Sequence, residues 1–315
     1  MRTEIWRIMK IAFLNLVHTD PEIVGRVAEK LTGDPDFDMY IHVDAKSDIA
    51  PFKSRLQNNS QVFFTQQREK VYWGGYHAID ATYVLLRTAL ASKRHYDYFV
   101  VLQNLDYPIK SNTYIKQFFT EHAGTEFIRG CYIAGTKDWL YAKKYRLYYR
   151  KDSEFLQTHK TGILKRLRDL WLGICSVATI GCDGIIHESD RNYPIYYGTA
   201  QWAVTRACAE YLDTFEKTHP KFNAKMKIMQ FPDEEYFHTA VHNSEFKTHC
   251  SAYDEQPQRW LVNWRNLHYF EFPKSVTTFE EKDFDRLMGR EELFIRKVRT
   301  GVSEGLLDKI DTATE

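Results

Sequence analysis

The sequence predicts an α/β fold in which a mixed, mainly parallel sheet is flanked by helices. Short apolar runs alternate with segments whose apolar residues recur every three or four positions, the pattern of strands alternating with amphipathic helices. The 315 residues are 43% hydrophobic and 15% aromatic, which excludes a disordered chain. A chain of this length can bury a large core without disulfides or a structural metal.

Four apolar runs in the first half have the length and composition of buried strands. Helical periodicity follows between and after them, and Ser111 is placed to cap one of the helices. The predicted strands are residues 11–17, 39–43, 62–64 and 98–102, and the predicted helices are residues 21–31, 76–91, 112–122 and 206–218. In such folds ligands bind beyond the carboxyl ends of the strands, so the residues that follow each strand matter most.

Residues of about 131–192 interrupt the alternation and are rich in Lys, Arg and Tyr, so we interpret them as a variable basic insert within one continuous domain. The segment GILKRLRDLWLGI at 162–174 predicts a basic amphipathic helix. Such a helix could rest on an anionic membrane surface. The alternative is a helix packed against its own domain.

Charge and cysteine content narrow the functional class. The chain has 43 basic and 42 acidic residues, which excludes the strongly basic character of a general nucleic-acid binder. Its five cysteines are odd in number and lack CxxC spacing, so neither a zinc knuckle nor a closed disulfide framework is expected. No apolar stretch approaches the length of a membrane span. We therefore expect a soluble chain in the cytoplasm, with peripheral contact at the inner face of the membrane as an option.

The densest chemical signal is PDEEYFH at 232–238, where a proline is followed by three carboxylates and an apolar helix. The acidic residues could do no more than complement the helix dipole. Alternatively, one of them could act as a general base. Helical spacing would also place Glu234, His238 and His242 on one face, as in a metal-dependent hydrolase, although the pattern is not HExxH. A non-catalytic glycan-binding protein, using its aromatic side chains as stacking platforms, is a further alternative.

No pair of acids follows a buried strand, where a divalent cation on a diphosphate would be chelated. Residues 103–108, QNLDYP, offer one acid only, Asp106. Without a cation, fixed positive side chains would have to neutralise a departing diphosphate. Candidates near the C-terminus are Lys274, Arg296, Lys297 and Arg299.

Together these segments resemble the family of core-2/I-branching N-acetylglucosaminyltransferases and peptide O-xylosyltransferases. The resemblance spans about residues 10–298 and rests on eight motifs in the family's order. They are KIAFLNLVH, IHVDAKSD, VYWGGYHAIDATYVLL, YFVVLQNLDYPIKS, YYGTAQWAV, PDEEYFHT, KSVTTFEEKDF and LFIRKV. It implies a glycosyltransferase-A type fold, a UDP-sugar donor, inversion at the anomeric carbon and activity without a metal or other cofactor.

By resemblance, Glu234 matches the catalytic base and Lys297 the diphosphate-binding lysine. Lys274 stands where the branching enzymes carry an arginine, so it keeps the charge but loses the two-pronged guanidinium. Asp44 matches the uridine-binding position, and three residues in other family motifs are expected to line the donor site: Trp73, Gly74 and Asp106. Residues of about 10–130 and 193–300 would then form the nucleotide-sugar-binding half and the acceptor and catalytic half.

The resemblance leaves the donor sugar open. PDEEYFHT is closer to the xylosyltransferase form and the C-terminal motifs are closer to the N-acetylglucosamine enzymes, so we expect N-acetylglucosamine first and xylose next. Because the chain begins almost at its first strand, we expect a bacterial-type relative. Its acceptor would be a glycan or lipid-linked saccharide of a surface polysaccharide.

Overall fold

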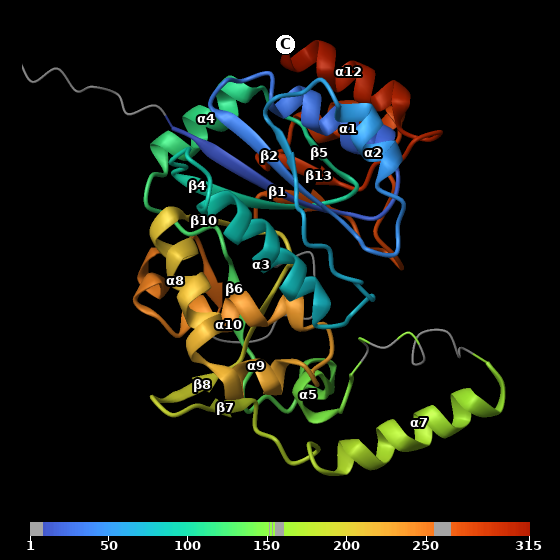
Figure 1. Ribbon diagram of the computed structural model, residues 1–315, viewed down its shortest axis with the longest axis vertical. Coiled ribbons are helices and arrows are strands. Elements are labelled where there is room, and N and C mark those ends of the chain that lie inside the picture. Colours follow the sequence, from blue (N-terminus) through green and yellow to red (C-terminus); the bar gives the residue numbers. More distant parts are fainter. Residues whose placement is uncertain (1–8, 151, 153, 155–160, 255–265) are drawn as a thin grey trace, which may run out of the picture.

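The structure is a computed structural model that describes residues 9–150, 152, 154, 161–254 and 266–315. Its centre is a five-stranded sheet of order β10-β4-β1-β2-β3, in which β1 to β4 are parallel and β10 is antiparallel (Figure 1). The strands are β1 Ile11–Val17, β2 Phe37–Val43, β3 Val62–Phe64, β4 Tyr98–Gln103 and β10 Ala203–Thr205. The predicted mixed, mainly parallel α/β fold is confirmed.

Helices cover both faces of this sheet, which is why β1 and β2 are apolar at nearly every position. One face carries α1 Pro21–Leu31, α2 Ala50–Leu56, α4 Asn112–Glu121, α11 Phe284–Met288 and α12 Glu304–Thr314. The other carries α3 His77–Leu90, α8 Arg206–Thr218, α9 Pro220–Met226 and α10 Tyr236–His242. Each face therefore has its own apolar core.

Local sequence signals account for most of these elements. Strands 11–17 and 62–64 and helices 21–31 and 206–218 have the predicted bounds. The strands predicted at 39–43 and 98–102 are longer by one or two residues, and the helices predicted at 76–91 and 112–122 are slightly shorter. The hydroxyl of Ser111 accepts a hydrogen bond from the amide of Tyr114 at 3.2 Å, as expected of a helix N-cap.

Three small sheets complete the described chain. The first consists of β12 His268–Phe270, β13 Phe294–Arg296 and β5 Asp106–Pro108. The second consists of β11 Tyr253–Asp254, β6 Gly130–Tyr132 and β9 Tyr196–Gly198. The third consists of β7 Ile185–His187 and β8 Asn192–Pro194. Short 3-10 helices lie at Pro232–Glu234, Glu245–His249 and Glu281–Asp283. The elements after residue 266 pack in the core of the first half of the chain, so packing does not follow chain order.

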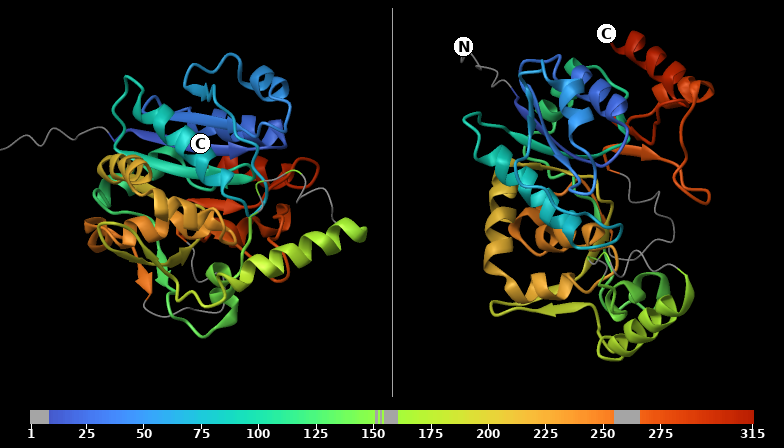
Figure 2. Two further views of the ribbon diagram at one scale, coloured as in Figure 1. Left: turned by 60° about the horizontal axis from the view of Figure 1, so that its bottom comes forward. Right: turned by 45° about the vertical axis from the view of Figure 1, so that its right-hand side comes forward.

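The basic insert contains α5 Trp139–Arg146 and α7 Gly162–Val177. α5 packs against the body, whereas α7 projects from it (Figures 1 and 2). None of the helices in the described ranges combines the length and the apolar character that crossing a bilayer requires.

Candidate active site

The carboxyl ends of β1, β2 and β4 meet at one edge of the central sheet because these strands are parallel. Asn104, directly after β4, is bonded to the residues that follow β1, since its Oδ1 accepts hydrogen bonds from the backbone amides of His18 at 2.6 Å and Thr19 at 2.9 Å. Asp44 directly follows β2 at the same edge.

Asp44 is buried, and its carboxylate accepts a hydrogen bond from the Lys46 amide at 2.8 Å and forms an ion pair with the Lys46 ammonium. That ammonium also lies 4.6 Å from the centroid of the Tyr72 ring. Lys46 therefore connects Asp44 to the loop that carries Trp73 and Gly74.

Trp73 and Gly74 lie against Phe231, the residue immediately before the PDEE motif. The Trp73 ring is 75% exposed and meets the Phe231 ring edge-on at 4.5 Å between centroids. Gly74 has φ 75°, and a Cβ there would lie 2.7 Å from Cε1 of Phe231. Only glycine suits both the conformation and the space. The contact brings the strand-end edge to the predicted catalytic motif.

The PDEE motif is not one helix with the residues that follow it, so that expectation is wrong. Pro232 to Glu234 form a 3-10 helix, the backbone turns at Glu235 (φ −125°), and α10 begins at Tyr236. Phe231 itself is left-handed (φ 55°), a conformation that costs a non-glycine residue free energy and is found at functional sites. The break separates Glu234 from the helix face that carries His238.

Glu234 lies in a cluster of opposite charges. The Lys144 ammonium from α5 lies 2.9 Å from Glu234 Oε2 and 3.3 Å from Glu235 Oε1. The Tyr197 hydroxyl of β9 lies within electrostatic reach of Glu234, and the Lys144 ammonium stands 4.4 Å from the centroid of the Tyr197 ring. The side chain of Glu234 is 24% exposed, against 9% for Lys144 and none for Glu235. Of the two glutamates that Lys144 contacts, Glu234 is the one that solvent reaches.

The cluster carries three carboxyl groups and one ammonium. Burial raises the pKa of Glu235 to about 8, against the opposing effect of Lys144. Burial, with a further contribution from the Glu234 charge, raises the pKa of Asp233 to about 7. Burial disfavours the charge of Lys144, but Glu234 and Glu235 outweigh it and raise the pKa of the ammonium. Raised carboxyl pKa values beside a buried cation are typical of functional sites.

The alternative grouping of Glu234, His238 and His242 on one helix face is also wrong. Both histidines are buried in α10, and burial lowers the pKa of His238 to about 3 and that of His242 to about 4. His242 Nε2 lies 2.9 Å from the Ile128 carbonyl oxygen. A Cβ on Gly198 would lie 2.2 Å from His238 Nε2, so His238 packs tightly against β9. The two imidazoles are neutral packing groups.

Asp106, expected to line the donor site, is 3% exposed and occupied by internal partners. Its carboxylate lies 2.7 Å from Arg296 Nη1 and 3.2 Å from His268 Nε2, and it accepts a hydrogen bond from the Gln103 amide at 2.7 Å. Burial opposes this charge, but Arg296 and His268 outweigh it and hold the pKa of Asp106 below its usual value. Asp106 is placed to hold Arg296 in position.

Lys297 and Arg299 directly follow β13, which ends at Arg296. We call these three cations the positive edge. Burial, together with the charges of Arg299 and Arg296, lowers the pKa of Lys297. His18 at the end of β1 lies within electrostatic reach of Asp44, Arg296 and Arg299, although burial dominates the lowering of its pKa. Among the residues that the structure describes, no carboxylate forms an ion pair with Lys297 or Arg299. These two cations are therefore available to an anionic ligand.

Lys274 is exposed on the loop between β12 and the 3-10 helix at 281–283. Its loop is bound to the Lys297 segment through the backbone, because the Lys297 amide donates to the Thr277 carbonyl at 3.1 Å and the Phe279 amide donates to the Lys297 carbonyl at 2.9 Å. The two predicted diphosphate-binding lysines thus belong to one local unit, although no described contact joins their side chains.

The segment YYGTAQ at 196–201 connects the Glu234 cluster to the positive edge. At one end the Tyr197 ring lies 4.4 Å from Lys144, the partner of Glu234, and at the other end the side-chain Nε2 of Gln201 donates to Gln103 Oε1 at 3.2 Å. The Gln103 carbonyl in turn accepts from Arg296 at 3.1 Å. Sequence reasoning recognised this segment as a motif, and the structure gives it this connecting role.

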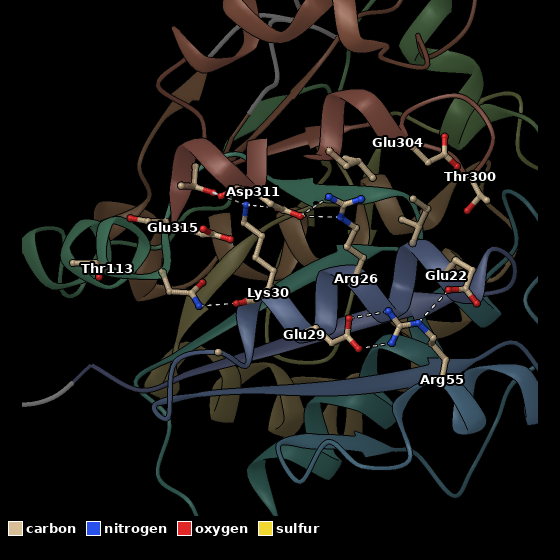
Figure 3. A pocket seen from close by; sticks show the side chains of 16 residues that line it. Glu22, Arg26, Glu29, Lys30, Arg55, Thr113, Thr300, Glu304, Asp311 and Glu315 are labelled. Atoms are coloured by element: carbon tan, nitrogen blue, oxygen red, sulfur yellow. Dashed lines mark hydrogen bonds and ion pairs between the residues drawn. The ribbon is translucent and has the colours of Figure 1, made fainter. Parts of the chain in front are cut away.

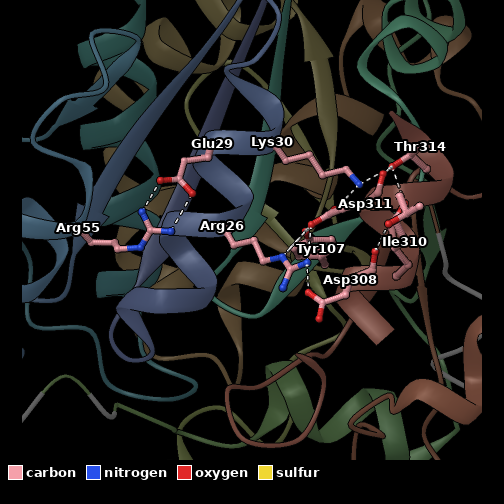
Figure 4. A network of polar contacts seen from close by, with 10 residues as sticks. Arg26, Glu29, Lys30, Arg55, Tyr107, Asp308, Ile310, Asp311 and Thr314 are labelled. Carbon is pink, nitrogen blue, oxygen red and sulfur yellow. Dashed lines mark hydrogen bonds and ion pairs between the residues drawn. The ribbon is translucent and has the colours of Figure 1, made fainter. Parts of the chain in front are cut away.

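A separate groove of about 950 Å³ lies between α1, α12 and the start of α4 (Figure 3). It contains none of the predicted site residues. Its basic side chains already have partners: Arg26 and Lys30 each lie 2.7 Å from Asp311, and Arg55 binds Glu29 (Figure 4). With its cations paired in this way, the groove does not suit a diphosphate.

Two Asp-x-Asp triplets outside the site, at residues 34–36 and 36–38, are held by internal partners. Asp34 and Asp36 bind the Lys116 ammonium at 2.7 and 2.8 Å, and Asp38 is buried against Arg94 and Tyr96. In the ranges that the structure describes, no three His, Cys, Asp or Glu side chains are grouped so that they could hold a metal ion.

Three residues of the site were missed in the sequence. Lys144 stood in a basic run, KKYRLYYRK, that resembles a solvated surface, and its partner Glu234 is 90 positions away. Tyr197 and Phe231 looked like core aromatics. The only available signal was that the basic run is itself interleaved with tyrosines, the composition of a ligand-binding surface.

Comparison with known proteins supplies an independent line of evidence. The family model described as Core-2/I-Branching enzyme matches residues 11–288, which is most of the chain. Glucosyl-3-phosphoglycerate synthase from Mycobacterium tuberculosis, solved with Mn²⁺, UDP-glucose and phosphoglyceric acid, overlaps with 81% of this chain and 74% of its own at a TM-score of 0.32 and 10% identity. That overlap is too low to support a conclusion about ligands.

Two curated relatives illustrate the range of the similarity. The xylosyltransferase oxt of Drosophila melanogaster is 22% identical over 88% of this chain. The bovine β-1,3-galactosyl-O-glycosyl-glycoprotein β-1,6-N-acetylglucosaminyltransferase is 23% identical over 93% of it. The chain spans 30% of the length of the first relative and 66% of the second.

Proposed function

The chain belongs to the Core-2/I-branching enzyme family, and we propose that it is an inverting glycosyltransferase. It transfers a sugar from a UDP-sugar to a hydroxyl of a glycan or glycoconjugate acceptor. The names of both curated relatives support this class of reaction. The observation that carries the proposal is the cluster of three carboxyl groups around the Lys144 ammonium, in which the accessible glutamate, Glu234, lies beside the strand-end edge where ligands of α/β sheets bind.

Glu234 is the general base in this proposal. At neutral pH, Glu235 with a pKa of about 8 is mostly protonated and Asp233 with a pKa of about 7 is partly protonated. Glu234 pairs with the Lys144 ammonium at 2.9 Å and is the more exposed of the two glutamates beside it. A base must be within reach of the acceptor hydroxyl, and Glu234 meets that condition in this cluster.

The reaction is a single displacement. Glu234 accepts the proton of the acceptor hydroxyl while the acceptor oxygen forms a bond to the anomeric carbon. The bond from that carbon to the diphosphate oxygen breaks on the opposite face, and UDP leaves with the electron pair. An α-linked donor therefore gives a β-linked product.

Positive side chains neutralise the departing diphosphate without a metal in this proposal. Lys297 and Arg299 have no carboxylate partner among the described residues, and Lys274 belongs to the same local unit. The carboxylate that follows β4, Asp106, is occupied by Arg296 and His268. In a partly dry cleft, fixed cations can stabilise such a leaving group strongly.

Asp44, Trp73 and Gly74 line the donor side in this proposal. Asp44 stands at the end of β2, where its carboxylate could accept hydrogen bonds from a nucleoside. Trp73 offers an exposed ring beside the Glu234 turn. N-acetylglucosamine is the first donor to test and xylose the second, because the relatives include enzymes named for each sugar.

The test is UDP release by the purified chain with a panel of UDP-sugars. We expect one donor to support turnover and to raise the free energy of unfolding by about 2.7 kcal/mol at a concentration one hundred times its Kd. Turnover with that donor should persist in EDTA. Activity lost in EDTA and restored by manganese would overturn the metal-independent assignment. Failure of every UDP-sugar to bind would overturn the proposed function.

A further inference from the structure

The apolar face of α7 points away from the protein. Its larger apolar side chains are 57% to 74% exposed at every third or fourth position, at Ile163, Leu167, Leu170, Ile174 and Val177. We call these five residues the α7 stripe. The less exposed positions of the same helix are mixed in character: Lys165, Arg168, Leu172, Cys175 and Ser176. A helix packed on its own domain would bury the apolar face instead.

The C-terminal end of α7 is firmly attached. The Ser176 hydroxyl accepts a hydrogen bond from the Tyr148 amide at 2.9 Å, and the Thr179 hydroxyl donates to the Arg146 carbonyl at 2.8 Å. The Trp171 and Tyr148 rings meet edge-on at 5.6 Å. The helix is therefore anchored at one end and projects beyond the body (Figures 1 and 2).

Lysine and arginine are concentrated in the part of the sequence that leads into and through α7. Residues 137–169 contain ten Lys and Arg but four Asp and Glu, whereas the whole chain has a net charge of only +1. Arg166 is exposed on α7, and Lys137 and Arg150 are exposed on the neighbouring segments. On α7 itself Asp169 is the only acid, and it pairs with Lys165 and Arg168.

We propose that α7 docks on an anionic lipid bilayer. Its stripe would lie at the boundary between headgroups and acyl chains, and the surrounding cations would contact lipid phosphates. Aliphatic side chains on one face of a helix, with Lys and Arg on its other positions, are typical of helices that lie in a membrane interface. A second copy of the chain would bring the same positive charge to the contact, so the charge favours an anionic lipid surface over a second copy.

The attachment of α7 links this surface to the candidate active site. Arg146, which binds Thr179, lies two positions after Lys144, the partner of Glu234. The Tyr149 ring lies 6.0 Å from the Phe231 ring beside the Glu234 turn. A saccharide anchored in the same bilayer would therefore be presented close to Glu234; this last consequence rests on the proposed function, whereas lipid binding does not.

The test is co-sedimentation of the full chain with vesicles of phosphatidylcholine alone and of an equimolar mixture with phosphatidylglycerol. We expect sedimentation with the mixed vesicles and little with phosphatidylcholine, falling as salt is raised. The double variant Leu170→Glu, Ile174→Glu should bind at least about a hundredfold more weakly, and Arg166→Gln roughly fivefold more weakly. Tyr114→Glu, at an exposed aromatic residue on α4, is the matched control and should bind as the parent does.

Three outcomes would overturn the inference. The parent chain could fail to sediment with the mixed vesicles, or the double variant could sediment as the parent does. The parent could also be a dimer without lipid that the double variant converts to a monomer, which would assign the stripe to a second copy. UDP release from a soluble acceptor is measured separately, so failure to bind lipid and failure of the proposed function are distinguishable.

Discussion

Two ionic clusters of this protein differ in how their charges are matched. Between α1 and α12, Asp311 is met by Arg26, Lys30 and Tyr107, all at 2.7 Å (Figure 4). Burial opposes its charge, but Lys30, Tyr107 and Arg26 outweigh burial and hold the pKa of Asp311 below its usual value. Arg26 also lies 2.7 Å from Asp308, so two cations meet two carboxylates in this cluster.

At the Glu234 turn the ionisable groups are not matched in number, because three carboxyl groups lie around one described ammonium, that of Lys144. Two of those carboxyl groups, Asp233 and Glu235, have raised pKa values. Matched charge joins two helices in the first cluster. In the second cluster, the burial of carboxyl groups with raised pKa values costs stability, which points to chemistry rather than to folding.

Removing Lys144, the cation that the described residues supply to the Glu234 cluster, should have a large effect on turnover. We expect Lys144→Met to lower kcat about a hundredfold and to move the acidic limb of the pH profile to higher pH, because the Glu234 carboxylate loses the charge that favours it. Lys144→Arg should restore part of the activity and the original profile. An unchanged profile in the methionine variant would assign Lys144 a purely structural role.

The cations of the strand-end edge come next. Lys297→Ala and Arg299→Ala should each weaken UDP binding about tenfold to a hundredfold, since each removes a charged contact to phosphate. Isothermal titration with UDP measures this directly. Lys110→Ala, whose ammonium binds the Arg290 carbonyl, is the matched control and should leave UDP affinity unchanged.

Breaking the matched cluster should affect folding alone. We expect Asp311→Asn to lower the free energy of unfolding by about 1–3 kcal/mol, because Arg26 and Lys30 lose a charged partner. Its specific activity, measured below the unfolding transition, should equal that of the parent. A fall in activity without a fall in stability would mean that the groove between α1 and α12 takes part in function.

The smallest effect is a pH dependence of stability. The folded chain holds the Glu235 proton up to about pH 8, whereas an unfolded glutamate releases it near pH 4.5. Ionisation therefore favours unfolding as pH rises through this window. Urea denaturation at about pH 5 and about pH 8 should show Glu235→Gln gaining stability relative to the parent at the higher pH. A constant difference would mean that Glu235 is already ionised in the fold.

The sequence predicted the sheet and several helices closely because their signals are local. Apolar runs gave β1 and β3, and apolar periodicity gave α1 and α8, with their observed bounds. The break at Glu235 was missed, since a proline followed by acids reads as an ordinary helix start. It depends on the left-handed Phe231 and its contacts with Trp73 and Tyr149, which lie far away in the chain.

The candidate site was predictable only in part, for the same reason. Resemblance and strand-end position pointed to Glu234, Asp44 and Lys297. Nothing local distinguishes Lys144 from its basic neighbours, because its role comes from a carboxylate 90 residues away. The amphipathic pattern of α7 was visible in the sequence, but the direction of its apolar face was not.

The most direct test of the central claim compares three matched amide variants, Asp233→Asn, Glu234→Gln and Glu235→Gln, in single-turnover transfer from a saturating UDP-sugar. We predict a loss of about 10² to 10⁴-fold for Glu234→Gln with UDP binding intact, and at most a modest loss for the other two. A Glu234→Gln variant that retains parental turnover, while one of its neighbours is inactive, would contradict the assignment of the base.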